Sequence, residues 1–232
     1  ESFEFHRIYH QLNDFMVDLS REYIDVVKDR LYTAAPNSRA RRSAQTALWR
    51  IGEALVRLAA PIMSFTADEV WAVLPKISGR PESVHLAYFP KAEDITGPIA
   101  DAAKANALWK DLETLMKVRD VALKALEIAR QEKQIGSALE ATVTVTAPEE
   151  LVPLLERYRG DLRFLLIVSG VEVKRGAGGN GNAPLHVQVE KAPGQKCERC
   201  WNYSVQVGKN ERYPTVCERC SSALDEIERE QA

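Results

Sequence analysis

The sequence lacks the patterns that mark membrane proteins, secreted proteins and uniformly basic nucleic-acid binders. Its 232 residues contain no apolar run close to the roughly 20 residues that span a bilayer. The first four residues, ESFE, have neither the basic nor the apolar region of a signal peptide. A formal net charge of −2 excludes a chain that is basic throughout, but it allows a local basic patch. Because the sequence lacks an initial methionine and enters a helical pattern almost at once, we expect a piece of a longer protein.

Patterns typical of catalytic sites are missing as well. No serine lies in a G-x-S-x-G setting. The glycine-rich stretch 175–184 has no lysine–serine pair and no following helix, so it is interpreted as a hairpin loop or linker rather than a phosphate-binding loop. His6 and His10 lie four residues apart, but no third metal ligand is near, and we interpret them as structural or solvated. The sequence therefore predicts no catalytic residue.

The four cysteines form the most specific pattern in the sequence. Cys197 and Cys200 make one C-x2-C pair, and Cys217 and Cys220 make a second pair after a gap of sixteen residues. Two such pairs present four thiolates to one tetrahedral ion, so the spacing predicts one structural zinc. A four-cysteine site is coordinatively closed, and we expect it to shape a surface rather than to catalyse. Four cysteines in metal spacing, with none left over, also favour a reducing, cytoplasmic compartment.

Cations and aromatic rings surround the predicted zinc site. Lys196, Arg199 and Trp201 flank the first cysteine pair, and Arg212 and Tyr213 precede the second. Cations meet phosphates and flat rings stack on splayed bases, so this composition favours an unpaired nucleic-acid strand, with RNA as the first candidate. We predict RNA contacts for Arg199 and Trp201. Two structural alternatives stay open: the two aromatic rings fill the small core beside the metal, and Arg199 offsets the charge of the thiolates.

The first part of the chain has the pattern of amphipathic helices. Apolar residues recur every three or four positions over residues 5–32, 39–60 and 100–132, and Ser38 is the predicted cap of the second helix. A shorter helix is predicted to begin at a capping box that starts with Thr66. Four helices of this kind predict a bundle.

The second helix carries a row of arginines on the side opposite its apolar residues. At roughly 100° per residue, Arg39, Arg50 and Arg57 align along the helix, and Arg42 lies close to them. We predict that these four arginines form an exposed basic ridge that contacts RNA phosphates.

The pattern changes in the last hundred residues. Residues 141–147 and 185–189 alternate at period two, with a helix-like stretch between them, which indicates a small α/β module. The predicted fold is mainly α and ends in a four-cysteine zinc ribbon or knuckle. The expected domains are a helical domain at 1–136, an α/β module at 137–192 and a zinc-binding domain at 193–232.

Several segments taken together resemble one protein family. They are KDRLY at 28–32, RRSAQTAL at 41–48, RLAAPIMSFTADEVW at 57–71 and CERCW at 197–201. In this order they look like the carboxy-terminal anticodon-binding and zinc-binding region of bacterial isoleucyl-tRNA synthetases. The related valyl and leucyl families have similar helices but do not end in this four-cysteine element. The resemblance covers nearly the whole chain.

This resemblance implies an enzyme only for the full-length protein. That protein would be an isoleucine–tRNA ligase, a class I aminoacyl-tRNA synthetase that joins isoleucine to tRNA(Ile) using ATP. The catalytic motifs of the family do not occur here, so this chain is expected to bind no ATP and to be inactive alone. The implied partners are the tRNA(Ile) anticodon stem-loop and the catalytic and editing domains of the same full-length chain. No membrane partner is expected.

Two other classes of function remain as alternatives. A zinc-ribbon module for DNA binding or repair also uses a four-cysteine knuckle with arginines, and the terminal finger alone resembles that of formamidopyrimidine-type glycosylases. A non-catalytic interaction scaffold is the third candidate. Binding to tRNA, to duplex DNA or to neither separates the three.

Overall fold

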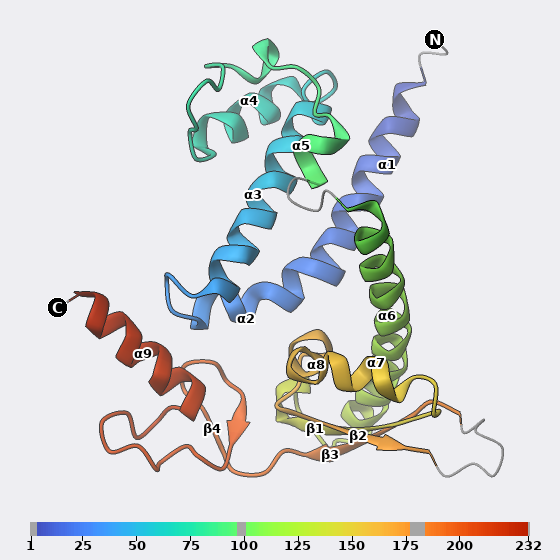
Figure 1. Ribbon diagram of the computed structural model, residues 1–232, viewed down its shortest axis with the longest axis vertical. Coiled ribbons are helices and arrows are strands. Elements are labelled where there is room, and N and C mark those ends of the chain that lie inside the picture. The colour runs from blue at the N-terminus through green and yellow to red at the C-terminus, as the bar shows by residue number, and fades with distance from the viewer. Residues whose placement is uncertain (1–3, 97–100, 177–183, 232) are drawn as a thin grey trace. The chain divides into compact units, whose positions relative to one another are not determined.

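The computed structural model describes residues 4–96, 101–176 and 184–231 (Figure 1). Most of the glycine-rich stretch that was interpreted as a hairpin loop or linker lies outside these residues. No helix in the described part of the chain combines the length and the apolar character that crossing a membrane requires.

The chain divides into two compact units. The first unit consists of Glu1–Leu31 and Pro36–Ala102, and the second consists of Tyr32–Ala35 and Ala103–Ala232. The sequence instead predicts three domains with boundaries after residues 136 and 192. This finer division stays a prediction, and each unit is described by itself below.

The first unit is helical. Its elements are α1 (Phe5–Asp18), a π-helical segment (Leu19–Ile24), α2 (Asp25–Thr33), α3 (Arg39–Ala59), α4 (Ser64–Val73), a 3-10 turn (Val84–Leu86) and α5 (Ala92–Thr96). Ser38 caps α3 as predicted, because its hydroxyl accepts a hydrogen bond of 3.4 Å from the Arg41 backbone N–H. The capping box predicted at Thr66 is wrong. Helix α4 begins two residues earlier, and the Ala67 N–H already bonds to the Met63 carbonyl.

Trp71 of α4 is the centre of a small core in the first unit. Its ring is 2% exposed and packs with residues of α3 and the 3-10 turn, including Val56 and Val84. The indole N–H donates to the Pro81 carbonyl at 3.0 Å. The Arg80 guanidinium lies 3.7 Å from the ring centroid and donates to the Leu74 carbonyl at 3.0 Å, which satisfies the end of α4. These contacts attach the loop after α4 to the helices.

The second unit contains a three-stranded sheet and, after it, the segment that holds Cys197, Cys200, Cys217 and Cys220, which we call the cysteine element. Its elements are α6 (Ala102–Gln131), a 3-10 turn (Ala138–Glu140), β1 (Ala141–Ala147), α7 (Val152–Arg157), α8 (Arg159–Leu166), β2 (Gly170–Arg175), β3 (His186–Lys191), β4 (Gln195–Lys196), β5 (Tyr203–Ser204) and α9 (Glu218–Gln231). The sheet order is β2-β1-β3, with β2 parallel and β3 antiparallel to β1. Helices α7 and α8 form the crossover that parallel pairing of β1 and β2 requires. Figure 1 shows β4 and α9 as parts of the separate element that follows the sheet.

The core of the second unit lies between the sheet and its helices. Alternate side chains of β1 are fully buried, among them Val143 and Val145, and they pack in one cluster with Val118 of α6, Leu155 of α7 and Leu162 of α8. Each such aliphatic side chain contributes about 1.5–3 kcal/mol on burial. The predicted fold class, helices followed by a small α/β module and a four-cysteine element, is confirmed.

The cysteine element is tied to the α/β module through Ser169 and Gly194. The Ser169 hydroxyl accepts a hydrogen bond of 2.7 Å from the Tyr203 backbone N–H in β5 and donates to the Leu139 carbonyl. Gly194 has φ +89°, and a Cβ at this position would lie 2.3 Å from the carbonyl group of Ser204. Only glycine therefore allows this close approach, which fixes the cysteine element on the module.

Candidate zinc centre and nucleic-acid interface

The structure brings the four cysteines together in one buried cluster. All four sulfur atoms lie within 4.8 Å of one another, and the Sγ atoms of Cys200 and Cys217 are 3.6 Å apart. This separation is too long for a disulfide, which needs about 2.05 Å. It fits a tetrahedral zinc ion, because bonds of about 2.3 Å place two sulfurs roughly 3.8 Å apart. The donor set therefore has the chemistry and the spacing of a closed structural zinc site.

Hydrogen bonds among Cys200, Cys217 and Cys220 shift the pKa values of their thiols. Hydrogen bonds from Cys217 and Cys220 lower the pKa of the Cys200 thiol. The same shared bonds raise the pKa of Cys217 to about 11 and raise that of Cys220 above its ordinary value. Four thiolates do not coexist in so small a volume unless a positive ion compensates them. A bound zinc ion supplies that charge, and its binding releases the thiol protons.

Local backbone hydrogen bonds shape the first knuckle. The Cys197 N–H donates to the Asn202 carbonyl at 2.8 Å, and the Trp201 N–H donates to the Cys197 carbonyl at 2.9 Å. The Cys217 N–H donates to the Cys197 sulfur at 3.3 Å, which joins the two cysteine pairs. Because these bonds lie within a few residues or between the ligands themselves, the C-x2-C spacing is sufficient to specify this geometry.

Arg199 lies against the metal cluster. Its half-buried guanidinium donates to the Cys220 sulfur at 3.7 Å and to the backbone carbonyl of Thr33. A zinc ion with four thiolates carries a net charge of −2, so a cation here offsets it. The structural alternative for Arg199 therefore has direct contacts in its favour, and its RNA contact stays a prediction.

Thr33 is a contact that no pattern in the sequence predicts. It is 7% exposed and lies in the short segment 32–35 that belongs to the second unit. Its hydroxyl accepts a hydrogen bond of 2.9 Å from Arg219, while its carbonyl accepts one from Arg199. Both knuckles have the same sequence, C-E-R-C, so the two arginines occupy equivalent positions. The repeat indicates that Arg199 and Arg219 play similar roles. Nothing in the sequence around residue 33 indicates that Thr33 is the partner of both.

Trp201 is the exposed aromatic residue of the cysteine element. Its ring is 60% exposed, and the Lys196 ammonium lies 5.2 Å from the ring centroid. Tyr213 packs on the cysteines, as the alternative of rings that fill the metal core expects, whereas the exposure of Trp201 favours a role at the surface. The RNA contact of Trp201 stays a prediction. Trp201 also has φ +65°, a left-handed conformation that costs a non-glycine residue about 1–2 kcal/mol. The chain thus holds a large ring at the surface in a strained conformation.

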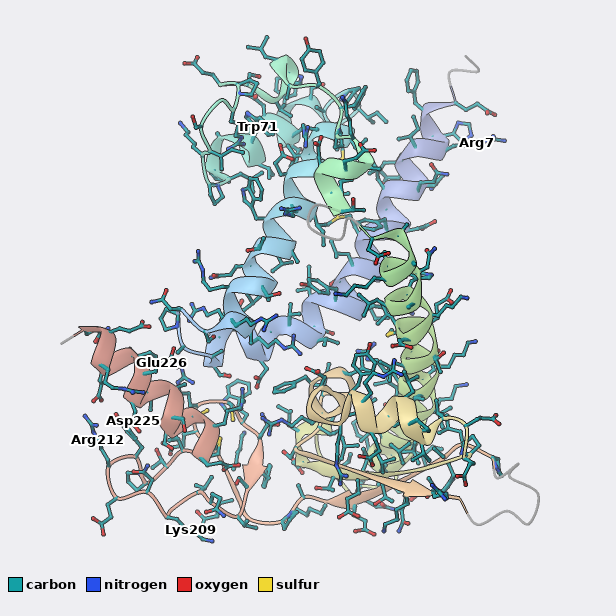
Figure 2. The ribbon with its side chains drawn as sticks, viewed as in Figure 1. Arg7, Trp71, Lys209, Arg212, Asp225 and Glu226 are labelled. Atoms are coloured by element: carbon teal, nitrogen blue, oxygen red, sulfur yellow. The ribbon has the colours of Figure 1, made fainter. Side chains whose placement is uncertain are left out.

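The loop before the second cysteine pair is clamped to α9. Figure 2 shows Arg212 on this loop next to Asp225 of α9, and their charged groups are 3.2 Å apart. Arg212 also pairs with Glu228, and the Tyr213 hydroxyl donates to Glu228 at 2.6 Å. The bond to the carboxylate raises the pKa of Tyr213 to about 12. Arg212 is therefore engaged inside the element rather than available as a free cation.

The four arginines of the predicted ridge differ in exposure. Arg39 and Arg42 are exposed on α3, whereas Arg50 and Arg57 are half-buried. The Arg57 guanidinium pairs with Glu53 and donates to the Tyr88 carbonyl at 3.2 Å. The expectation of an exposed basic ridge is therefore wrong for Arg50 and Arg57, and at Arg57 the reason is its contact with Tyr88 in the loop after α4. The RNA contacts of all four arginines stay predictions.

Two family models match separate stretches of the chain. The model of a family described as the anticodon-binding domain of tRNA ligase matches residues 1–145. A second model, described as the zinc finger found in FPG and IleRS, matches residues 194–223. Together with the cluster of four sulfurs, this second match confirms the predicted structural zinc site.

Curated relatives cover almost the whole chain. The isoleucine–tRNA ligase of Syntrophotalea carbinolica is 45% identical over 230 residues, which is 97% of this chain and 24% of the relative. The enzymes of that name from Geobacter sulfurreducens and Histophilus somni are each 42% identical and cover 96% and 95% of this chain. The chain spans about a quarter of the length of these relatives. Because the anticodon-binding match extends over more than half of its residues, the chain belongs to the family of anticodon-binding domains of tRNA ligases.

Proposed function

We propose that this chain reads the anticodon of tRNA(Ile) as part of an isoleucyl-tRNA synthetase. The observation that carries the proposal is the order of two modules in one chain, an anticodon-binding domain followed by a zinc finger of the type found in FPG and IleRS. Relatives that match 95–97% of this chain, and so both modules of it, carry the name isoleucine–tRNA ligase. A DNA-repair module accounts for the zinc finger but not for the match over residues 1–145.

The enzymatic activity belongs to the whole protein in this proposal. The full-length chain joins isoleucine to tRNA(Ile) using ATP, and its catalytic and editing domains act with the region described here. This region alone is expected to show no exchange of pyrophosphate with isoleucine and ATP. We further propose that it acts as three domains, with the zinc-binding domain at residues 193–232 as the tip that meets the anticodon loop.

The proposed recognition separates phosphate contacts from base contacts. Arg39 and Arg42 are exposed on α3 and contact phosphates. Trp201 stacks on an unpaired base, because its ring is exposed and held beside Lys196. Arg199 stabilises the zinc centre that presents this ring and contacts RNA from its exposed side. The zinc ion supplies rigidity and takes no part in chemistry.

Binding to short RNAs tests the proposal. Fluorescence anisotropy with the 232-residue chain should show tighter binding to the anticodon stem-loop of tRNA(Ile) than to the same stem-loop with a changed anticodon. A duplex DNA of equal charge is the control for the repair alternative. Equal affinity for the two stem-loops would rule out anticodon reading, and preference for duplex DNA would favour the repair module.

A further inference from the structure

A large pocket of the first unit has no role in the recognition scheme above. It has a volume of about 1070 Å³ and lies between α3, α4, α5 and the loop that joins α4 to α5. Figure 2 labels Trp71 of α4, whose buried ring supports one wall of the pocket. The volume lies just above the usual range for ligand pockets, which is about 300–1,000 Å³. The pocket therefore has room for a nucleotide that remains attached to its strand.

The charges that line this pocket favour an anion. Four cations lie on its walls, Arg50, Arg57, Arg80 and Lys91, against only two carboxylates, which leaves an excess of two positive charges. Arg57 and Arg80 are engaged by groups of the protein. In the residues that the structure describes, neither the Arg50 guanidinium nor the Lys91 ammonium has a hydrogen bond or an ion pair. These two groups are therefore available to a phosphate.

The same pocket carries exposed aromatic rings at its edge. Tyr88 is 91% exposed and the adjacent Phe89 is 62% exposed, and both line this pocket. Arg57 donates to the Tyr88 carbonyl and is held in turn by Glu53. The backbone of Tyr88 is thus fixed to α3 while its ring stays in solvent. An exposed ring on an anchored backbone, beside cations without partners, is an arrangement that binds unpaired bases.

We propose that this pocket binds one unpaired nucleotide of an RNA loop. Its base stacks on Tyr88, and its phosphate lies between Arg50 and Lys91. Arg57 is a positioning residue here, because its guanidinium holds the Tyr88 backbone instead of contacting RNA. The ligand is single-stranded, since a base inside a duplex does not offer its face to a protein ring. This inference rests on the proposed function and adds a second base-binding position to that of Trp201.

The test compares pocket variants with matched surface variants of the same unit. Tyr88→Ala is paired with Phe65→Ala, because Phe65 is 89% exposed and does not line the pocket. Lys91→Gln is paired with Lys76→Gln, which removes a charge outside it. The probe is the anticodon stem-loop of tRNA(Ile), with 2-aminopurine placed at one loop position at a time. Circular dichroism and zinc content verify that each variant is folded.

Tyr88→Ala is expected to weaken binding about fivefold to hundredfold, whereas Tyr88→Phe keeps the ring and stays close to the unchanged chain. At one loop position, 2-aminopurine fluorescence should be quenched by the unchanged chain and not by Tyr88→Ala. Arg50→Gln and Lys91→Gln should each reduce the log-log salt slope by about 0.7. The control variants should bind as the unchanged chain does.

The outcomes separate the two proposals. If the unchanged chain prefers the cognate stem-loop while Tyr88→Ala binds as tightly as Phe65→Ala, the pocket inference is wrong and the proposed function stands. If the chain binds cognate and altered stem-loops equally but Tyr88→Ala still loses affinity, the pocket binds RNA and anticodon reading fails. A chain that binds neither RNA overturns both.

Discussion

The cysteine element is expected to be more stable with glycine at position 201 than with alanine, although both substitutions of Trp201 remove the ring. Trp201 has φ +65°, and alanine inherits this left-handed conformation at a cost of about 1–2 kcal/mol. Glycine adopts it freely but loses about 0.5–1 kcal/mol more backbone entropy on folding. The difference should therefore favour glycine by up to about 1.5 kcal/mol, and by roughly 0.75 kcal/mol at the middle of the two ranges. The lost burial of the indole ring cancels in this comparison, because both variants remove the ring. The loss is small in any case, because Trp201 is 60% exposed in the folded chain.

The two variants should behave alike toward RNA. Each removes a stacking surface worth about 1–3 kcal/mol, so both should lose affinity for the anticodon stem-loop to the same extent. Stability is measured as zinc retention against a chromophoric chelator during denaturation, and affinity is measured by anisotropy. Val205 provides the control pair, because it is 53% exposed in the same element and is not among the residues with positive φ. At that position, glycine should be less stable than alanine.

Two results would refute this reasoning. If Trp201→Ala retains zinc as well as or better than Trp201→Gly, the left-handed backbone stores no strain. If both variants lose zinc together with RNA affinity, the ring is a structural part of the metal site and its stacking role is wrong.

Three further predictions concern the metal and its surroundings. Cys217→Ser should abolish stoichiometric zinc binding and unfold the C-terminal element while the helical signal in circular dichroism largely persists; zinc that survives the change would contradict the four-cysteine assignment. Gly194→Ala should destabilise the same element by more than about 1 kcal/mol, because the new Cβ meets a carbonyl at 2.3 Å and φ is +89°; an unchanged thermal transition would show that the turn relaxes. Absorbance titration should show Tyr213 ionising near pH 12 instead of about pH 10, because the Glu228 carboxylate favours the neutral phenol. A raised folded-state pKa means that this contribution to stability is complete below pH 10 and is lost as the pH rises through 12, and Tyr213→Phe should remove that dependence.

The zinc site and the regular elements could be predicted because their causes are local. The C-x2-C pairs place two sulfurs on one turn of backbone whatever the rest of the chain does. Alternation over β1 and the 3.6-residue stripe of α3 reflect repeating geometry, and Ser38 caps α3 through a hydrogen bond from Arg41, three residues away. The failed cap at Thr66 shows the limit of such reasoning, since the helix had already begun at Ser64.

What each cation does was decided by tertiary structure. Arg57 and Arg39 align on the same side of α3, yet only Arg57 meets Tyr88, a partner 31 residues away in the sequence. Arg199 and Arg219 meet at Thr33, which is 166 and 186 residues distant. The sequence by itself determined that this chain has amphipathic helices, a small sheet and a zinc site, because spacing along the backbone is sufficient to specify them. Folding alone decided which arginines are engaged and which remain available, because a guanidinium takes its partner from whichever carbonyl, carboxylate or sulfur the returning chain places beside it.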